Sequence, residues 1–338
     1  MVEPTKARVA VAAHPAPLEP GTAAAVRRLA ADAAAHDGVP PLSEQPLLWL
    51  EDPEAHVVHL LATAPEVGED EPAGPEPVEH GLVGYAQVEV GSGSTARAEL
   101  VVHPAHRRTG VGTALLDAAR VTAGKVKGRE LRVWAHGDLP EARALAQSAG
   151  MAVVRELWQM RLDLAQRPQV PDRALPPRVT VREFVPGQDE EAWRRVNSRA
   201  FAHHPEQGRM TSADLRAREA EPWFDPAGFL LAERDGMLLG SVWTKVHPEG
   251  EHGDERVGEI YVVGVDPDAQ GLGLGGALTD LGLTSLTVAG LRSVILYTEA
   301  SNEVAIRTYR RAGFERSGVD VMFGDDTPRS PSGATMAP

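Results

Sequence analysis

The sequence predicts a mixed α/β fold in which one domain occurs twice in tandem. The segment that starts at Val102, with glycines at positions 110 and 112, recurs 163 positions later from Val265, with glycines at positions 273 and 275. The Ala-Gly pair at 149–150 and the pair at 312–313 are separated by the same 163 positions, so the copies align over this span without a gap. Residues 166–177 include four prolines, a composition typical of an extended linker. We expect a first domain at 1–165, a linker at 166–177, a second domain at 178–324 and a flexible tail at 325–338.

Hydrophobic patterning predicts corresponding elements in the two copies. Strands are expected at 57–61, 82–90, 99–102 and 131–135 in the first copy, with a helix at 110–124. In the second copy, strands are expected at 228–233, 239–246, 259–265 and 293–298, with a helix at 273–289. The acidic run 66–79, rich in Pro and Gly, is expected to form a solvated loop. The hydrophobic patterns therefore predict that each copy is an α/β domain with a mixed sheet.

Length and composition exclude several classes of protein. The 338 residues suit two domains, and the hydrophobic and charged fractions of 42% and 24% are those of a globular protein. No apolar stretch approaches a membrane span and no export signal opens the chain, so a cytoplasmic protein without membrane partners is expected. The absence of Cys excludes disulfides and thiolate nucleophiles. A net charge of -14 argues against nucleic acid as a partner, and we expect a monomer.

Each copy runs from a strand into a turn with two glycines and then into a helix. Glycine tolerates positive φ and close backbone approach, so the N–H groups of such a turn can converge on a phosphate at the positive end of the helix. Glycine pairs at these turns also serve as tight-turn devices alone, and that alternative stays open. Neither copy has a Walker A sequence or the Rossmann glycine pattern.

These motifs resemble those of the GNAT N-acetyltransferase superfamily. Arg107-x-x-Gly110-x-Gly112 and Gln270-x-x-Gly273-x-Gly275 are similar to its pyrophosphate loop, and the segment from Asn302 to Gly313-Phe314 resembles its second signature. Dispersed pieces resemble more narrowly a tandem GNAT family whose acceptor is the cysteine amine of a cysteinyl-glucosaminyl-inositol. They are Asp37-Gly-Val-Pro-Pro-Leu-Ser-Glu44-Gln, Glu99-Leu-Val-Val-His-Pro, Trp134-Ala-His-Gly, His204-Pro-Glu206-Gln-Gly, Trp223-Phe-Asp-Pro and Thr244-Lys245-Val-His-Pro.

The resemblance implies two tandem GNAT domains and acetyl-CoA as cosubstrate. It places cofactor contacts in the second copy at Val263, Gly264, Val265, Gln270, Gly271, Leu272, Gly273, Leu274, Gly275, Gly276, Asn302, Glu303, Val304, Ala305, Ile306 and Arg307. In the first copy, it places them at Leu100, Val101, Val102, Arg108, Thr109, Gly110, Val111, Gly112 and Thr113, where acetyl-CoA would be a structural ligand. The family often has basic residues at the positions of Gly271 and Leu272, so this sequence departs from it there. The first copy has such a basic residue, Arg108.

The constant offset shows where the copies differ. Tyr309, Asn302 and Tyr297 of the second copy correspond to Ala146, Leu139 and Trp134 of the first. The first copy therefore has no phenol or amide at the second signature. We infer that the second domain is catalytic and the first is not.

Acetyl transfer from a thioester to an amine requires a base for the amine and benefits from an acid for the departing thiolate. Glu259 and Tyr309 have suitable chemistry, and the resemblance assigns them these roles. Glu259 could instead be an ordinary strand carboxylate, and Tyr309 a core aromatic residue. Asn302 follows Glu299-Ala-Ser and is also a natural N-cap.

The resemblance further implies a small-molecule thiol glycoside as acceptor. It places the substrate contacts at Glu44, Glu206, Lys245, Glu259 and Tyr297. Local alternatives are a first-turn helix carboxylate for Glu44, a turn residue for Glu206 and a surface cation for Lys245. The adjacent histidines at 203 and 204 lack a spaced third ligand, so no metal site is expected.

Two other functions remain compatible with the sequence. A GNAT enzyme acting on another amine, such as an aminoglycoside or a protein N-terminus, would share the glycine turns. A non-enzymatic acyl-CoA sensor would share them as well, but would not require Glu259 or Tyr309.

Overall fold

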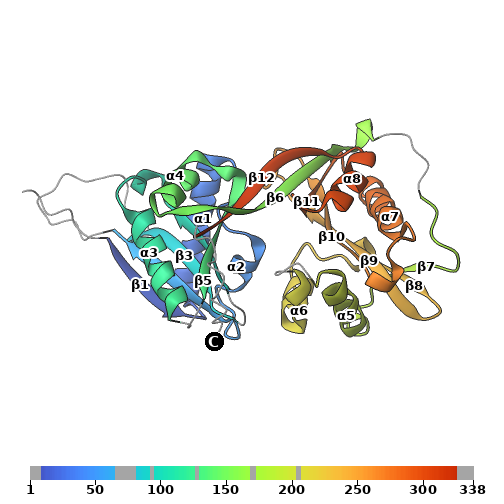
Figure 1. Cartoon of the computed structure of the whole chain (residues 1–338), viewed down its shortest axis with the longest axis horizontal. Coiled ribbons are helices and arrows are strands. Elements are labelled where there is room, and N and C mark those ends of the chain that lie inside the picture. Colours follow the sequence, from blue (N-terminus) through green and yellow to red (C-terminus); the bar gives the residue numbers. More distant parts are fainter. Residues whose placement is uncertain are drawn as a thin grey trace, which may run out of the picture. The chain divides into compact units, whose positions relative to one another are not determined.

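The computed structural model describes residues 9–64, 81–91, 95–125, 129–167, 173–202 and 207–325 (Figure 1). The chain divides into two compact units. Unit 1 comprises Met1–Glu156 with Val319–Pro338, and unit 2 comprises Leu157–Gly318. Among the described residues, no helix has the length and apolarity that crossing a membrane requires.

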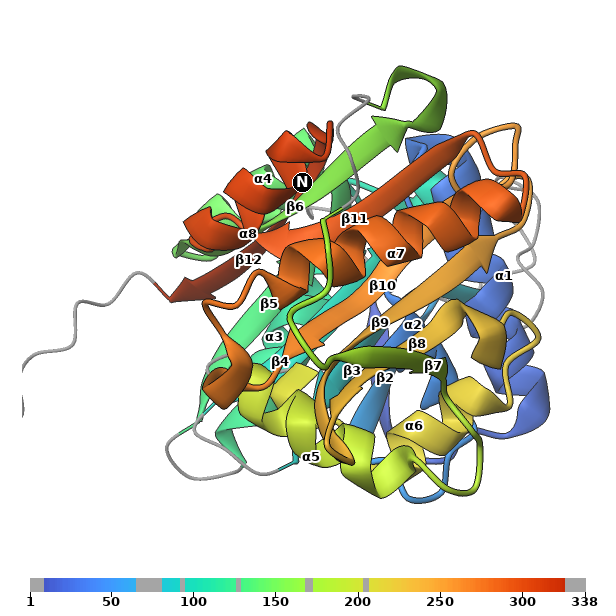
Figure 2. The same cartoon turned by 90° about the vertical axis from the view of Figure 1, so that its right-hand side faces the viewer.

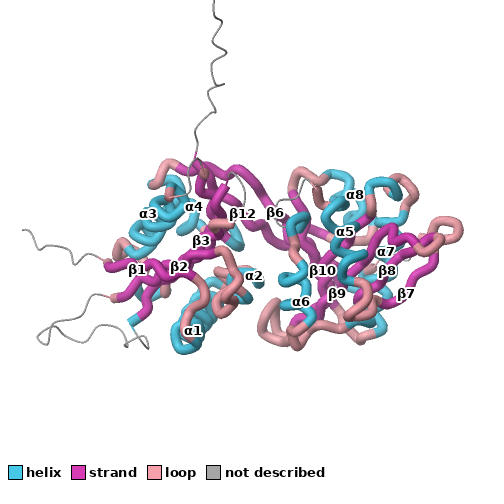
Figure 3. The backbone as a smooth tube through the Cα atoms, turned by 90° about the horizontal axis from the view of Figure 1, so that it is seen from below, coloured by secondary structure: helices cyan, strands magenta, loops and turns pink. Residues whose placement is uncertain are grey.

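Unit 1 is a sheet with helices on both faces. Its elements are β1 (Ala10–Pro15), α1 (Pro20–Asp37), α2 (Glu44–Leu48), β2 (Val57–Thr63), β3 (Leu82–Glu89), β4 (Thr95–Val102), α3 (Val111–Gly124), β5 (Glu130–Ala135) and α4 (Pro140–Ser148). The strand order is β1-β2-β3-β4-β5-β12, where β12 is Glu315–Asp325, and β4 and β5 are parallel to each other. β1 and β2 lie side by side at the edge of this sheet (Figure 3). One core joins α3 to the sheet, and a second core lies beneath α1.

Unit 2 repeats this plan. Its elements are the second part of β6 (Met151–Asp163), β7 (Thr180–Glu183), α5 (Glu190–Ala200), α6 (Ser212–Glu219), β8 (Phe229–Arg234), β9 (Met237–His247), β10 (Val257–Val265), α7 (Leu274–Val288), β11 (Ser293–Glu299), α8 (Glu303–Arg311) and the start of β12 (Glu315–Asp325). The strand order is β6-β11-β10-β9-β8-β7, with β10 and β11 parallel. The mixed α/β class and the repeat are thus confirmed.

Successive side chains of β9 point to opposite faces of the sheet, so the core of unit 2 has one part on each face. Val242 packs with the apolar side of α7, which lies over β9 and β10 (Figure 2). Trp243 faces the opposite way and stacks on Phe229, with ring centroids 4.5 Å apart, in the core that contains Trp193 of α5 and Leu215 of α6. Lys245 and His247, two and four residues further on, share the face of Trp243.

The strands and helices expected from hydrophobic patterning all form, with ends that differ by a few residues. The units, however, differ from the domains expected at 1–165 and 178–324. They separate between Glu156 and Leu157, within β6, and residues 319–325 of β12 belong to unit 1. The reason is long-range pairing: residues 157–163 of β6 pair with β11, while residues 321–324 of β12 pair with β5. The loop expected at 66–79 and the tail beyond Asp325 lie outside the described residues. The centre of the linker also lies outside them, whereas its two ends are described.

Candidate active site

The glycine turn of unit 2 forms the predicted strand-to-helix junction. Asp266 accepts a hydrogen bond from the backbone N–H of Asp268 at 3.0 Å and so starts the short 3₁₀ turn Pro267–Ala269. Gly271 and Gly273 then adopt positive φ angles of 81° and 79°, and Gly273 is the N-cap of α7. The N–H groups of the first helical turn have no acceptor within the helix, so this end of α7 favours an anion. Residues 270–276 are thus located where a pyrophosphate could bind.

The parallel strands β10 and β11 pair over a short stretch only. Within the described chain, the pairs are Gly258 with Val294 and Glu259 with Ile295. Beyond them the ladder between β10 and β9 shifts at Tyr261, which is a β-bulge. The bulge turns β10 away from its parallel neighbour, while residues 262–265 remain paired with β9. Within the described residues, no strand pairs with the other backbone edge of Val263, Gly264 and Val265, the residues for which cofactor contacts are expected.

Glu259 is a buried carboxylate with a buried histidine as its partner. Its residue is only 6% exposed, and Oε2 lies 2.7 Å from Nε2 of His247. Nδ1 of the same ring lies 2.6 Å from Oε2 of the half-exposed Glu251. Burial by itself would lower the pKa of His247, but hydrogen bonds with Glu251 and Glu259 raise it to about 9. The imidazole is therefore an imidazolium between two carboxylates at neutral pH.

Lys245 lies directly opposite Glu259 on the paired strand β9. Its Nζ lies 4.5 Å from the ring centroid of Trp223 and 5.6 Å from that of Tyr261. The Tyr261 hydroxyl accepts a hydrogen bond from Nε of Arg218 at 2.6 Å. Lys245 therefore lies in an aromatic environment next to Glu259, and is not an isolated surface cation.

The second signature forms β11, the turn after it and α8. Tyr309 is half-buried on α8 and packs edge-on against Phe314, with ring centroids 6.0 Å apart. Burial raises the pKa of Tyr309 to about 12, so its phenol is protonated at neutral pH. Asn302 is the N-cap of α8, since its Oδ1 accepts from the N–H of Ala305 at 3.1 Å. The hydroxyl of Tyr297 accepts from Nε2 of Gln159 at 2.9 Å.

His247, Glu251 and His252 also raise the question of a metal, because potential ligand atoms of all three lie within 4.8 Å of one another. The distance of 2.6 Å between His247 and Glu251 is that of a charge-assisted hydrogen bond, with a proton between the two atoms. A hydrogen bond from each ring nitrogen to a carboxylate accounts for the orientation of His247 without a metal ion. We therefore assign these contacts to hydrogen bonding.

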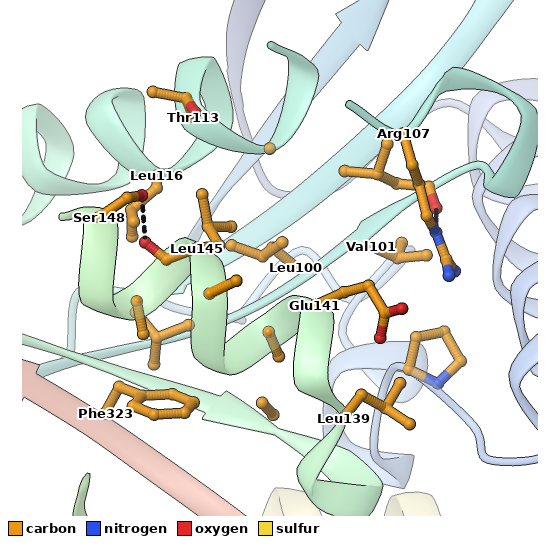
Figure 4. A pocket seen from close by; sticks show the side chains of 18 of the residues that line it. Leu100, Val101, Arg107, Thr113, Leu116, Leu139, Glu141, Leu145, Ser148 and Phe323 are labelled. Carbon is orange, nitrogen blue, oxygen red and sulfur yellow. Dashed lines mark hydrogen bonds between the residues drawn. The ribbon is translucent and has the colours of Figure 1, made fainter. Parts of the chain in front are cut away.

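Unit 1 contains a cavity of about 600 Å³ between β4, α3 and α4 (Figure 4). Its lining includes Trp134, Leu139 and Ala146, the three positions at which the first copy has lost the polar residues of the second. In Figure 4, Leu100 and Val101 approach the cavity from β4, and Leu139 and Leu145 from the α4 side. Of the expected cofactor contacts in this copy, those that line the cavity are Leu100, Val101, Val102, Arg108, Gly110, Gly112 and Thr113, whereas Thr109 and Val111 do not.

The strand register shows what replaces Glu259 in unit 1. Ile295 is the partner of Glu259 and corresponds at the constant offset to Arg132, which pairs with Arg97. Arg97 therefore occupies the position of Glu259, and its antiparallel partner Glu89 occupies that of Lys245. Arg97 Nε donates to Glu89 Oε2 at 2.8 Å. The carboxylate and the cation have thus exchanged places, which leaves a guanidinium where unit 2 has a potential base.

A second buried network in unit 1 surrounds Glu99. Its carboxylate accepts from the backbone N–H and the hydroxyl of Ser43, each at 2.7 Å, and lies 3.3 Å from Nε2 of His136. His136 Nδ1 lies 3.0 Å from Asp320. Burial would lower the pKa of His136, but Glu99 and Asp320 raise it to about 10. His136 also lines the cavity, so this polar network borders it.

Sequence reasoning found some of these residues and missed others. Glu44 is the first residue of α2, directly after Ser43, and Glu206 lies outside the described residues. His247 was missed although it follows Lys245 by two residues, and this period-2 spacing on a strand was a usable signal. Arg97 carried no such signal, because the bulge at Tyr261 shifts the register between the copies by one residue.

Comparison with known proteins agrees with this geometry. Residues 192–314 match the Acetyltransferase (GNAT) family, and residues 69–150 match an Acetyltransferase (GNAT) domain. A GCN5-related N-acetyltransferase from Sphaerobacter thermophilus has a similar structure, with a TM-score of 0.62 and 25% identity over 93% of this chain and 95% of that one. A tandem GNAT protein from the clavulanic acid biosynthesis pathway shares the fold, with a TM-score of 0.65 and 18% identity over 94% of this chain and all of the other. Fold and site thus define an acyltransferase with two GNAT domains.

The relatives at higher identity define the branch. The mycothiol acetyltransferase of Cellulomonas flavigena is 62% identical, with 94% of each chain covered. That of Streptomyces avermitilis is 50% identical, over 91% of this chain and 93% of the relative. The chain belongs to the mycothiol acetyltransferase family.

Proposed function

We propose that unit 2 transfers the acetyl group of acetyl-CoA to the cysteine amine of a cysteinyl-glucosaminyl-inositol and so forms mycothiol and CoA, the mycothiol synthase reaction. The observation that carries the proposal is the buried carboxylate of Glu259, held by His247 on the strand that leads into the glycine turn. The name shared by the relatives supports mycothiol as the product.

In the proposed mechanism, the glycine turn at 270–276 and the start of α8 hold the cosubstrate. Glu259 accepts a proton from the amine, directly or through a water molecule, and the nitrogen lone pair forms the new C–N bond at the thioester carbonyl. The C–S bond breaks as the tetrahedral intermediate collapses, and its electrons go to sulfur. Tyr309 donates its phenolic proton to that sulfur, and the phenolate is reprotonated by solvent. The backbone N–H groups on the free edge of β10 are suitable donors for the carbonyl oxygen.

The proposed acceptor contacts rest on different support. Lys245 and Glu259 are opposed on neighbouring strands, which favours a shared ligand. Tyr297 lies on β11, the strand from which β10 separates. The assignments of Glu44 and Glu206 rest on the sequence resemblance. A polyol ligand with one amine matches a set of spaced carboxylates, a hydroxyl and an ammonium group.

The substrate assignment is tested by supplying the purified chain with acetyl-CoA and either cysteinyl-glucosaminyl-inositol or free cysteine. We expect N-acetylated product, followed by mass spectrometry, with the glycoside at a kcat/KM far above that for cysteine. Equal rates with both acceptors would mean that the sugar and inositol make no productive contacts. No product from either would contradict the assignment and favour a different amine or an acyl-CoA sensor.

We further propose that unit 1 binds acetyl-CoA and does not turn it over. The cavity beside its glycine turn supports binding. Arg97 in place of Glu259 and Ala146 in place of Tyr309 leave these two positions of unit 1 without the base and the acid proposed for unit 2. The acetyl-CoA of unit 1 would then be a structural ligand, and the whole acetyl-transfer activity would belong to unit 2.

Equilibrium binding of CoA to the whole chain is expected to show two sites. The Arg108→Glu substitution reverses a charge in the lining of the unit 1 cavity and should remove one site, while turnover with saturating cosubstrate continues. Lys125→Glu makes the same charge change at the other end of α3 and should keep both sites. A single CoA per chain in the unsubstituted protein would reject the proposal for unit 1.

A further inference from the structure

His247 is held on both ring nitrogens by carboxylates of different exposure. It lies opposite Val257 in the ladder between β9 and β10, so Glu259 is its diagonal neighbour on the same face. The side chains of His247 and Glu259 are 7% and 8% exposed, whereas that of Glu251 is 52% exposed. The ring is thus tied to the buried carboxylate on one side and to a solvent-facing one on the other.

Two consequences follow for Glu259. One carboxylate oxygen is fixed by the Nε2–H of His247, so the other oxygen has a defined direction. The ring also places a positive charge 2.7 Å from a buried anion, which would otherwise lose much of the stabilisation that water gives it. The ion pair therefore also restrains the position of the carboxylate.

We infer that His247 is a positioning residue for acetyl transfer, which orients the carboxylate of Glu259, and that Glu251 in turn holds the His247 ring. The inference rests on the proposed role of Glu259 as the base. His247 itself need not touch the substrate.

Other charged groups also surround the ring. Lys245 on β9 disfavours the imidazolium. The ring of the neighbouring His252 packs edge-on against that of His247, with the centroids 4.4 Å apart. The pKa of His252 is lowered by burial and by His247, so His252 is the neutral ring of the pair. Arg161 on β6 donates to the backbone carbonyl of His252 at 3.3 Å. The two carboxylates outweigh burial and Lys245, since the pKa of His247 is raised to about 9.

The test is kcat and KM for His247→Ala, His247→Gln and His252→Ala, compared with the unsubstituted enzyme. Alanine removes the N–H that fixes one oxygen of Glu259, so kcat should fall about tenfold while the KM for acetyl-CoA changes little. Glutamine restores an N–H donor and should therefore recover much of the lost kcat relative to alanine. His252→Ala removes a ring from the same cluster and should leave kcat unchanged.

Glu251→Gln provides a second test that leaves the histidine in place. Removing this carboxylate lowers the pKa of His247, which is raised by Glu251 in the intact protein. His247 should then lose its extra proton at a lower pH, and the basic limb of the pH–activity profile should move to a lower pH as well. Thermal unfolding and acetyl-CoA binding are measured for each variant, so that loss of fold is distinguished from loss of activity.

Three results would overturn the inference. The first is an equal loss of kcat in His247→Ala and His247→Gln, without recovery by glutamine. The second is an unmoved basic limb in Glu251→Gln. The third is loss of activity on dialysis against EDTA and recovery with Zn²⁺, which would assign the cluster to a metal. If Glu259→Gln remains active, the proposed base is wrong, and this result is distinguishable from the other three.

Discussion

Replacing Glu259 by glutamine is expected to lower kcat at least about a hundredfold, the usual contribution of a positioned general base. Glutamine has nearly the same volume and can still accept from His247 through its carbonyl oxygen, but it cannot take the proton of the amine. The KM for acetyl-CoA should change little, because the glycine turn at 270–276 remains intact. Initial rates of CoA release at saturating acceptor, with kcat and KM determined separately, measure the effect.

The matched control for this substitution is Glu255→Gln. Glu255 also belongs to unit 2, two residues before β10, but it is exposed and pairs with Arg292 at 3.2 Å on the surface. Its loss should leave kcat unchanged. Comparable rates for Glu259→Gln and the control would show that Glu259 is the strand carboxylate of the simpler interpretation.

Replacing Tyr309 by phenylalanine is expected to lower kcat by about a hundredfold through the loss of a general acid. With a pKa raised to about 12, the phenol remains protonated below that pH and can donate throughout the working range. The ring packs against Phe314 and the core of unit 2, and phenylalanine preserves these contacts, so we expect little change in thermal stability.

The readout that identifies an acid is the dependence on the leaving group. An acetyl thioester of a more acidic thiol needs less protonation of its sulfur, so the difference between Tyr309→Phe and the unsubstituted enzyme should shrink with such a donor. An equal loss with both donors would indicate that Tyr309 serves only in packing. A lower melting temperature with unchanged kcat would lead to the same conclusion.

Much of the fold could be predicted because the sequences of the two copies align without a gap through their corresponding helices. The constant offset superposes α3 on α7 and α4 on α8, and thereby identified Ala146 as the counterpart of Tyr309. The glycine turns could be placed for a local reason, since positive φ at Gly273 favours a residue without Cβ. Period-2 and helical patterns placed the central strands and helices in the same way.

The missed features depend on pairings between residues far apart in the chain. Strand propensity does not specify the partner of a strand. The proline-rich linker therefore did not indicate that β6 and β12 are each divided between the two units. The one-residue shift at Tyr261 likewise follows from strand register, and it alone aligns Glu259 with Arg97.

The duplicated α/β domain, the two glycine turns and the residue types that distinguish the second copy from the first can all be predicted from the amino-acid sequence, because these features are local or repeat at a constant spacing. Three features are visible only in the folded chain: His247 joins Glu259 to Glu251, Arg97 occupies the position of Glu259 in unit 1, and this unit contains an apolar cavity. Each of these depends on which strands are neighbours and in what register, and hydrogen bonds between distant segments set both.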